Sequence, residues 1–532
     1  MKLYKLSITL VMMLCLLMTA CLNDLDTAPL NQQIITSKNV FDDPASYKEF
    51  LAKLYGVLTL TGQRGEYGQP EISADDEGTT SFLRGYFAIQ ELTTDECISA
   101  WGDAGLNDFR AHTWSAQNGY IQLLYQRVFV NIAYCNEYIR EVSARVNGLS
   151  ADMQKDVKLY LAEAKFLRAL YYYYALDLWG KVPFVTEADA PGAYLPRQIS
   201  RADLFVYIEK ELQDALPELA PAGANEYARA DQAAAHMLLA KLYLNAEVYL
   251  GKGNQRYTEC ITHCNAILNA GIYSLTENYA DLFLADNARL RNEIIFPVAE
   301  DGNYSRSYGG VTYIIHAAVG GSMDADNGFG IKSGGWSGNR FTKTFVNKFA
   351  DPSGATDKRA MFYTNGQTLE IDHTIVFTEG YLSTKYRNIT STGAKGQNET
   401  FVDTDFPLFR LADVYLMYAE AIVRGGSGGD FAKAVGYIND IRERAYGNTD
   451  GNIAAADVTL DFLLDERARE LYWEAHRRTD LIRFGKFAGD SYIWAWKGNV
   501  KDGAATPAYV TVFPLPASDR AVNTNLEQNF GY

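Results

Sequence analysis

Apolar residues recur at steps of three and four along several long segments of the chain, which is the spacing of an amphipathic helix. The clearest such segment runs from Met153 to Trp179, and Gly180 and Pro183 after it are residues that end helices. The same spacing predicts further helices at Ala202 to Leu216, Ala233 to Tyr249, Leu408 to Val423, Phe431 to Tyr446 and Leu460 to Ile482. The fold is therefore predicted to be mainly α.

Helices of this length, with Ala at close-packing positions and Tyr filling gaps, favour a scaffold of tetratricopeptide-like helical hairpins, although no strict repeat is readable. The consecutive residues Tyr171 to Tyr174 must face several directions on a helix. We expect some of them to pack in the core and some to meet a partner protein. The charged residues from Asp465 to Glu470 are expected to form ion pairs on a helix surface.

Two segments differ in composition from the predicted helices. Residues 300–400 are rich in Gly, Ser, Thr, Asn and aromatic residues, and residues 61–108 have the same character. Such composition is typical of loops, and binding residues are concentrated in loops that a rigid scaffold positions. We therefore predict that these segments form a loop-rich binding region with short strands.

The N-terminus has the pattern of a secretory signal. Lys2 and Lys5 precede a mostly apolar run from Leu6 to Met18, which is too short to span a bilayer, and small residues lead to Cys21. This pattern resembles a bacterial lipoprotein cleavage site, where acyl chains on the cysteine hold the protein on a membrane. The alternative is an ordinary signal with an incidental cysteine. Three segments are predicted: a lipoprotein signal peptide (1–20), a lipidated tether (21–33) and a single folded body (34–532).

Charge and cysteine content narrow the functional classes. Lys and Arg number 49 and Asp and Glu 65, so the formal charge is −16, which argues against a nucleic-acid partner. The body contains Cys97, Cys135, Cys260 and Cys264. A chain of this size does not need disulfides, so we interpret these cysteines as small buried side chains.

Two clusters were considered as metal sites. Cys260, His263 and Cys264 lie at helical spacing, but a closed zinc site takes four ligands and no second pair is evident. The acidic run from Asp75 to Glu77 lacks the alternating spacing and the glycine of a calcium loop. Neither a metal nor a cofactor is predicted.

Several segments match those of a known family in order and spacing. They are residues 21–26, 162–170, 179–183, 410–416, 438–442, 466–471, 477–483, 514–516 and 528–532. On these segments, which span nearly the whole chain after Cys21, the chain resembles the SusD/RagB family. Members of that family are surface lipoproteins of Bacteroidetes that bind glycans beside a TonB-dependent outer-membrane transporter.

Within the family the chain is most similar to the starch-binding member. The resemblance implies these glycan-binding residues: Trp101, Tyr308, Trp336, Arg84, Asp76 and Asp103. The three aromatic residues would form an arc along a curved α-1,4-glucan, and Arg84 and Asp76 would be its polar partners. The family's asparagine after Trp101 has no match in residues 102–104, where Asp103 is the candidate substitute.

The resemblance also implies the biological role. It is that of a starch- or maltooligosaccharide-binding lipoprotein, anchored by lipid on the cell surface at the outer membrane. This protein would capture glycan for a SusC-like TonB-dependent transporter, without catalytic activity of its own.

Side chains of these types suit a sugar, because Trp and Tyr offer a flat apolar face to its CH groups and Arg offers fixed donors to its hydroxyls. From composition alone, however, with 7 Trp and 36 Tyr in the chain, the three aromatic residues are better interpreted as ordinary core or interface side chains, and only the family resemblance favours a binding role. Three functional alternatives remain: a surface glycoside hydrolase with two carboxylates about 5 to 9.5 Å apart, a binder of a different glycan, and a helical scaffold that binds only protein.

Overall fold

The computed structural model describes residues 40–532, except 65, 67, 190, 191, 193, 324–327 and 333. The predicted signal peptide, Cys21 and the tether lie outside the described residues. The chain divides into two compact units, residues 1–47 and 48–532. In the first unit, the short 3-10 helix η1 (Val40–Asp42) places the Phe41 ring 5.1 Å from the Tyr47 ring. The predicted binding residues belong to the second unit.

The α-helices are α2 (Ser46–Gly56), α3 (Phe82–Glu91), α4 (Asn107–Ala111), α5 (Gly119–Arg145), α6 (Ala151–Leu178), α7 (Arg201–Ala215), α8 (Gln232–Leu244), α9 (Ala246–Leu250), α10 (Tyr257–Asn269), α11 (Gly310–Ala318), α12 (Lys343–Val346), α13 (Leu411–Val423), α14 (Phe431–Tyr446), α15 (Leu460–Leu471), α16 (Arg477–Arg483) and α17 (Ala517–Val522). The strands are β1 (Gly62–Arg64), β2 (Gly68–Pro70), β3 (Cys97–Ser99), β4 (Val182–Pro183), β5 (Gln198–Ile199), β6 (Ile294–Val298), β7 (Asn339–Phe341), β8 (Phe362–Tyr363), β9 (Leu382–Ser383) and β10 (Phe406–Arg410). They form two-stranded antiparallel pairs: β1–β2, β3–β7, β4–β5, β6–β10 and β8–β9.

Polar side chains cap the N-termini of several scaffold helices. Ser150 Oγ accepts a hydrogen bond from the backbone N of Met153 at the start of α6, and Ser200 does the same for α7. Asp231 Oδ1 accepts from the backbone N of Ala234 at the start of α8. Each cap satisfies a backbone donor that has no partner inside the helix.

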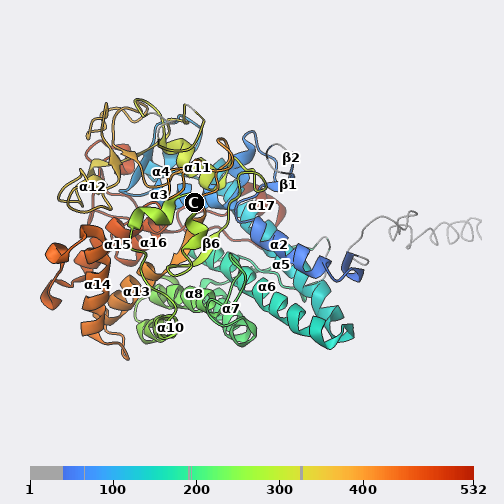
Figure 1. The fold of residues 1–532 in the computed structure, drawn as a ribbon. Coiled ribbons are helices and arrows are strands. Elements are labelled where there is room, and N and C mark those ends of the chain that lie inside the picture. Colours follow the sequence, from blue (N-terminus) through green and yellow to red (C-terminus); the bar gives the residue numbers. More distant parts are fainter. Residues whose placement is uncertain are drawn as a thin grey trace, which may run out of the picture. The chain divides into compact units, whose positions relative to one another are not determined.

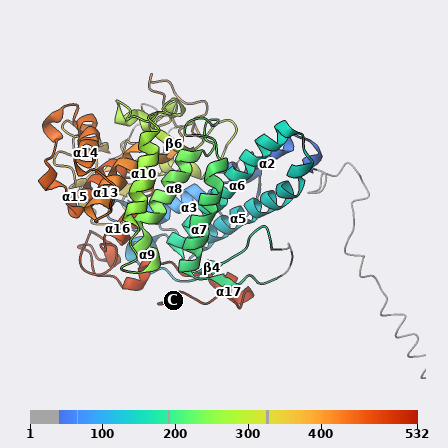
Figure 2. The ribbon, with the colours of Figure 1, turned by 90° about the horizontal axis from the view of Figure 1, so that it is seen from below.

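The long helices of the second unit lie side by side in sequence order. α5 packs on α6 and α6 on α7, while α8 packs on α10, α10 on α13 and α13 on α14 (Figure 1). The view from below shows α6, α7, α8, α10 and α13 as successive neighbours (Figure 2). The predicted mainly α fold of helical hairpins is confirmed. Among the described residues, no helix combines the length and the apolar character needed to cross a membrane.

The tyrosine run on α6 lies entirely in the core. The side chains of Tyr171, Tyr172, Tyr173 and Tyr174 are each at most 3% exposed. The expectation that some of them meet a partner protein is therefore wrong, because the packing around α6 leaves almost none of these four side chains accessible.

Three predicted helices have different limits. The segment 233–249 breaks at Asn245, whose side chain donates to the carbonyl of Lys241 and competes with the helix for it. The segment 408–423 becomes helical only at Leu411, because the preceding residues pair with β6 and Arg410 is extended. The segment 460–482 is interrupted between α15 and α16.

Two buried carboxyl groups stabilise the break between α15 and α16. Trp473 and Ala475 both have positive φ, 59° and 60°, a region that residues other than glycine seldom adopt. The backbone N of Trp473 donates to Glu96 Oε2 and that of Ala475 to Glu91 Oε1, at 3.2 and 2.7 Å. Hydrogen bonds to residues far away in sequence thus stabilise a backbone that the local pattern does not predict.

The two predicted loop regions also contain buried helices. α3 lies within residues 61–108 and α11 within residues 300–400, and every residue of both helices is buried. The interpretation of these segments as loops and short strands is correct for much of their length and wrong for α3 and α11.

A buried ionic network joins the C-terminal helices to the β6–β10 pair. Arg410 Nε donates to Glu474 Oε2 at 2.6 Å, and its Nη1 donates to Glu470 at 2.6 Å and to Glu293 at 3.2 Å. These four side chains are at most 1% exposed. Removal of these carboxylates would leave the Arg410 charge buried and uncompensated, which is strongly destabilising.

Glu470 is shared by several arginines. Besides Arg410 it accepts hydrogen bonds from Arg444 and from Arg359, the latter at 3.2 Å. Burial by itself raises the pKa of Glu470, but the three guanidinium groups lower it to about 2. Glu466, Arg467 and Glu470 are buried, so their ion pairs lie in the core and the expected surface pairing is wrong for them, whereas Asp465 remains partly exposed and pairs with Lys348.

We expect Glu470→Gln to lower the free energy of unfolding by about 3 to 5 kcal/mol, because three buried guanidinium groups lose a shared negative charge. Urea unfolding at pH 7 measures this loss. The matched control is Asp214→Asn in the exposed pair Lys210–Asp214, where a change within about 0.5 kcal/mol is expected. Similar small effects for both variants would show that the network contributes little.

A second prediction concerns pH. Burial raises the pKa of both Glu91 and Glu96, that of Glu96 to about 7. A carboxyl with a raised pKa in the folded state stabilises the fold at low pH and loses this contribution as the pH rises from about 4.5 to about 7. Glu96→Gln replaces this titrating carboxyl with a neutral amide. From pH 5 to pH 8, the free energy of unfolding of the parent should therefore fall by about 2 kcal/mol relative to that of the variant. A stability difference that does not change with pH would contradict it.

Candidate functional site

The β3–β7 pair brings Trp101 and Trp336 together. Ser99 pairs with Asn339 in the ladder, and the backbone N of Ala100 donates to the Gly338 carbonyl at 2.7 Å, just beyond the strands. Trp101 Nε1 then donates to the Trp336 carbonyl at 2.9 Å. Two residues that are 235 positions apart are thus joined by a short antiparallel ladder.

Helix α11 positions the remaining aromatic residue. The segment from Trp336 runs along the end of α11, where its backbone N donates to the His316 carbonyl at 2.6 Å. Tyr308 lies just before the start of α11, and its ring centroid is 6.3 Å from that of Trp336. Trp101, Tyr308 and Trp336 are each half-buried, so part of each side chain remains accessible. The structure therefore gathers the three predicted aromatic residues into one cluster.

The predicted polar partners adjoin this cluster. Arg84 on α3 is buried; its Nη2 donates to Asp76 Oδ2 at 2.8 Å and its Nη1 to the Tyr308 carbonyl at 3.3 Å. The Asp76 side chain is 55% exposed, so this carboxylate has free acceptor capacity toward solvent.

Asp103 is exposed and lies near the same group of charges. Burial raises the pKa of the Tyr120 phenol to about 12, with further increases from Asp103 and Asp76 and a decrease from Arg84. Asp103, Asp76 and Arg84 therefore all lie close enough to Tyr120 to affect the pKa of its phenol. All six residues of the predicted site are accounted for in one region of the second unit.

Comparison with known proteins identifies the family. A family model described as "SusD family" matches residues 323–532, and one described as "Starch-binding associating with outer membrane" matches residues 72–244. The chain is 33% identical to the starch-binding protein SusD of Bacteroides thetaiotaomicron, over 97% of this chain and 96% of that protein. The chain belongs to the SusD family. It is also 25% identical to the SusD-like protein P25 of Formosa agariphila, over 92% of both chains.

Solved structures of the SusD superfamily share the fold. A protein from Parabacteroides distasonis has a TM-score of 0.71 at 22% identity, covering 94% of this chain and all of that one. Surface glycan-binding protein A from B. thetaiotaomicron, solved in complex with laminarihexaose, has a TM-score of 0.68 at 18% identity, covering 91% and 99%. The SusD-type fold thus covers nearly the whole chain.

Two supporting residues were not predicted as part of the site. The Tyr313 ring on α11 lies edge-on to Trp101, with centroids 5.9 Å apart, and Arg84 lies 4.8 Å above it. Asn339 Nδ2 donates to its hydroxyl at 3.1 Å. Tyr313 is buried and contacts both a predicted platform and its polar partner. Its segment was interpreted as a loop, so no helical spacing pointed to it.

His316 supports Trp336 from one turn further along α11. The two rings are nearly parallel with centroids 4.8 Å apart, and His316 Nε2 lies 2.9 Å from the Thr400 carbonyl. Burial lowers the pKa of His316 to about 4. The imidazole is therefore neutral at ordinary pH, donates from Nε2 to the carbonyl, and acts as a flat support behind Trp336.

A buried acid fixes the loop that carries Tyr308. Glu300 Oε1 accepts from Thr59 Oγ1 at 2.7 Å and from the backbone N of Val311 at 3.1 Å, and Ser305 donates to Oε2 at 3.2 Å. Burial raises the pKa of Glu300 to about 8. This carboxyl is largely protonated at neutral pH, and its contacts are all within the protein.

The two clusters considered as metal sites have structural roles. Asp76 caps the short helix η2 (Glu77–Thr80) by accepting from the Gly78 backbone N at 3.0 Å. Cys260 and Cys264 are free and buried in the helix packing, as predicted. In the part of the chain that the structure describes, no group of three or more His, Cys, Asp or Glu residues is arranged to hold a metal.

Close packing at Gly338 offers a test of the cluster geometry. A Cβ at this position would lie 2.7 Å from a ring carbon of Trp101, whereas a Cβ at Gly102 would meet nothing within 4 Å. We expect Gly338→Ala to displace the Trp101 indole, shift tryptophan emission and lower stability by about 1 to 3 kcal/mol. Gly102→Ala should leave both quantities unchanged. Identical spectra for the two variants would contradict the Trp101 position described here.

Proposed function

We propose that this protein binds starch or maltooligosaccharides at the cluster of Trp101, Tyr308 and Trp336. The observation that carries the proposal is the clustering of three accessible aromatic side chains from distant segments beside the Arg84–Asp76 ion pair. An arc of flat apolar faces matches the CH faces of successive sugar rings in a curved chain, and the ion pair offers a donor and an acceptor to hydroxyls. Similarity to a starch-binding protein supports the choice of ligand.

The proposed cellular role is glycan capture at the outer membrane. In this role the protein is held on the cell surface by acyl chains on Cys21 and passes glycan to a SusC-like TonB-dependent transporter. The family model described as associating with the outer membrane supports this placement. Several acyl chains on one residue are enough for stable attachment, because each buried methylene contributes about 0.8 kcal/mol.

The site favours glycan binding without hydrolysis. A glycosidase needs a general acid with a raised pKa beside the scissile bond. Near the aromatic cluster, Glu300 has such a pKa, but it is buried and hydrogen-bonded to Thr59, Ser305 and the backbone of Val311. Its contacts suit a structural role. The test is incubation of the pure protein with maltooligosaccharides. Shortened products would overturn the proposal that the protein binds glycan without hydrolysing it.

We expect Trp101→Ala and Trp336→Ala to abolish retardation of the protein in native gels that contain starch, because each removes one of the three platforms. The predicted loss in affinity is at least about tenfold, or about 1.4 kcal/mol. The far-UV circular dichroism should not change. Phe530→Ala is the control, because this ring is 90% exposed near the C-terminus.

Two results would count against the proposal. Retardation of both tryptophan variants like the parent would refute the assignment of the aromatic cluster. Free migration of the parent protein in starch gels, with retardation by another glycan, would refute starch as the ligand.

A further inference from the structure

An exposed tyrosine lies on the loop that leads to Tyr308. The Tyr304 side chain is 83% exposed, yet its loop is held by many hydrogen bonds. Asp301 Oδ1 accepts from the backbone N of Asn303 at 2.9 Å and of Tyr304 at 3.0 Å. Asn303 Nδ2 donates to Gln397 at 2.9 Å. An aromatic ring is therefore presented to solvent from a fixed backbone, which is the arrangement of a binding platform with low ordering entropy.

Arg306 lies between this tyrosine and the aromatic cluster. Its guanidinium is 5.1 Å from the centre of the Phe401 ring, and that ring is 5.0 Å from the ring of Tyr308. Arg306 Nη2 also lies 2.5 Å from Glu66 Oε1, and the arginine side chain remains 44% exposed. The contacts thus continue from the cluster through Phe401 to an accessible ion pair.

Two guanidinium–carboxylate pairs are thus linked to Tyr308. Arg84, which pairs with Asp76, donates to the Tyr308 carbonyl, and Arg306, which pairs with Glu66, contacts the Phe401 ring that lies beside the Tyr308 ring. Each pair combines fixed donors with a carboxylate that has spare lone pairs, which is the chemistry that binds vicinal hydroxyls. The second pair lies at the surface, where the Arg306 side chain is accessible to a ligand.

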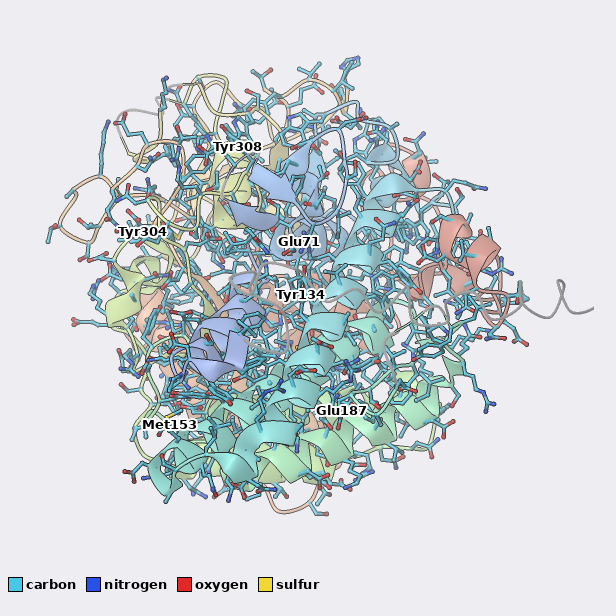
Figure 3. All side chains as sticks on the ribbon, turned by 90° about the vertical axis from the view of Figure 1, so that its right-hand side faces the viewer. Glu71, Tyr134, Met153, Glu187, Tyr304 and Tyr308 are labelled. Atoms are coloured by element: carbon cyan, nitrogen blue, oxygen red, sulfur yellow. The ribbon has the colours of Figure 1, made fainter. Side chains whose placement is uncertain are left out.

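We propose that Tyr304 and Arg306 form a further subsite that extends the aromatic arc and contacts additional sugar rings of a long glucan. This inference rests on the proposed function. Tyr304 and Tyr308 are four positions apart in the sequence, so their Cα atoms lie within about 14 Å of each other. One oligosaccharide of several rings can span both. Figure 3 labels both tyrosines, which lie in the upper left part of that view. The subsite makes the protein favour long chains over short ones, because only long chains reach it.

The test is calorimetry of maltotriose and maltoheptaose binding to the full chain. Tyr304→Ala and Arg306→Met should each weaken maltoheptaose binding about fivefold to tenfold and change maltotriose binding less than about twofold. Trp336→Ala should weaken both ligands. The matched controls are Phe530→Ala and Arg256→Met. Arg256 is a comparable arginine on the helical scaffold, 5.0 Å from the Tyr243 ring and paired with Glu209.

Two outcomes overturn the inference while leaving the proposed function intact. Maltoheptaose binding by both variants within about twofold of the parent would show that the subsite does not exist. Equal weakening of both ligands would show that these residues belong to the arc itself and do not select for length. If the parent binds neither ligand, the proposed function fails first and this inference fails with it.

Discussion

The buried pairing of arginines with carboxylates is the constraint on which the rest of the structure depends. Arg410 and Arg444 reach Glu470 from β10 and α14, and Arg359 reaches it from the segment before β8. Desolvation makes each charge unfavourable unless its partners are all present, so the network disfavours other arrangements of these elements more than it adds net stability. A strand, two helices and a loop therefore have one mutual arrangement in which every charge is satisfied.

The same kind of pairing reaches the candidate site. Asp95 lies between α3 and β3, and both of its oxygens accept from Arg477 on α16, at 2.6 and 2.8 Å. Burial alone raises the pKa of Asp95, but Arg477, together with Lys348 and the Tyr492 hydroxyl, lowers it below its usual range. The next residue, Glu96, accepts from the Trp473 backbone and precedes β3 directly. The ladder that carries Trp101 thus begins at residues that C-terminal charges fix in place.

Sequence pattern predicted long helices that begin at a local cap, such as those at 151–178, 201–215 and 431–446. It missed α3 and α11, because they are short and lie in segments whose Gly, Ser, Thr and Asn content is typical of loops. It also missed the interruption between α15 and α16, since the carboxyls that stabilise it lie almost 400 residues earlier. The six site residues came from resemblance to a family, and that resemblance did not include their supports, Tyr313 and His316.

The way in which Trp101 is held determines what it can offer a ligand. Its Nε1 is the only polar atom of the side chain, and it already donates to the Trp336 carbonyl. A sugar at this position meets an apolar ring face and no donor, so the tryptophan contributes contact area and little directional recognition. In the proposed function, ring spacing selects the curvature of the glycan, and discrimination between hydroxyl patterns falls to the accessible carboxylates of Asp76 and Asp103 and to Arg84.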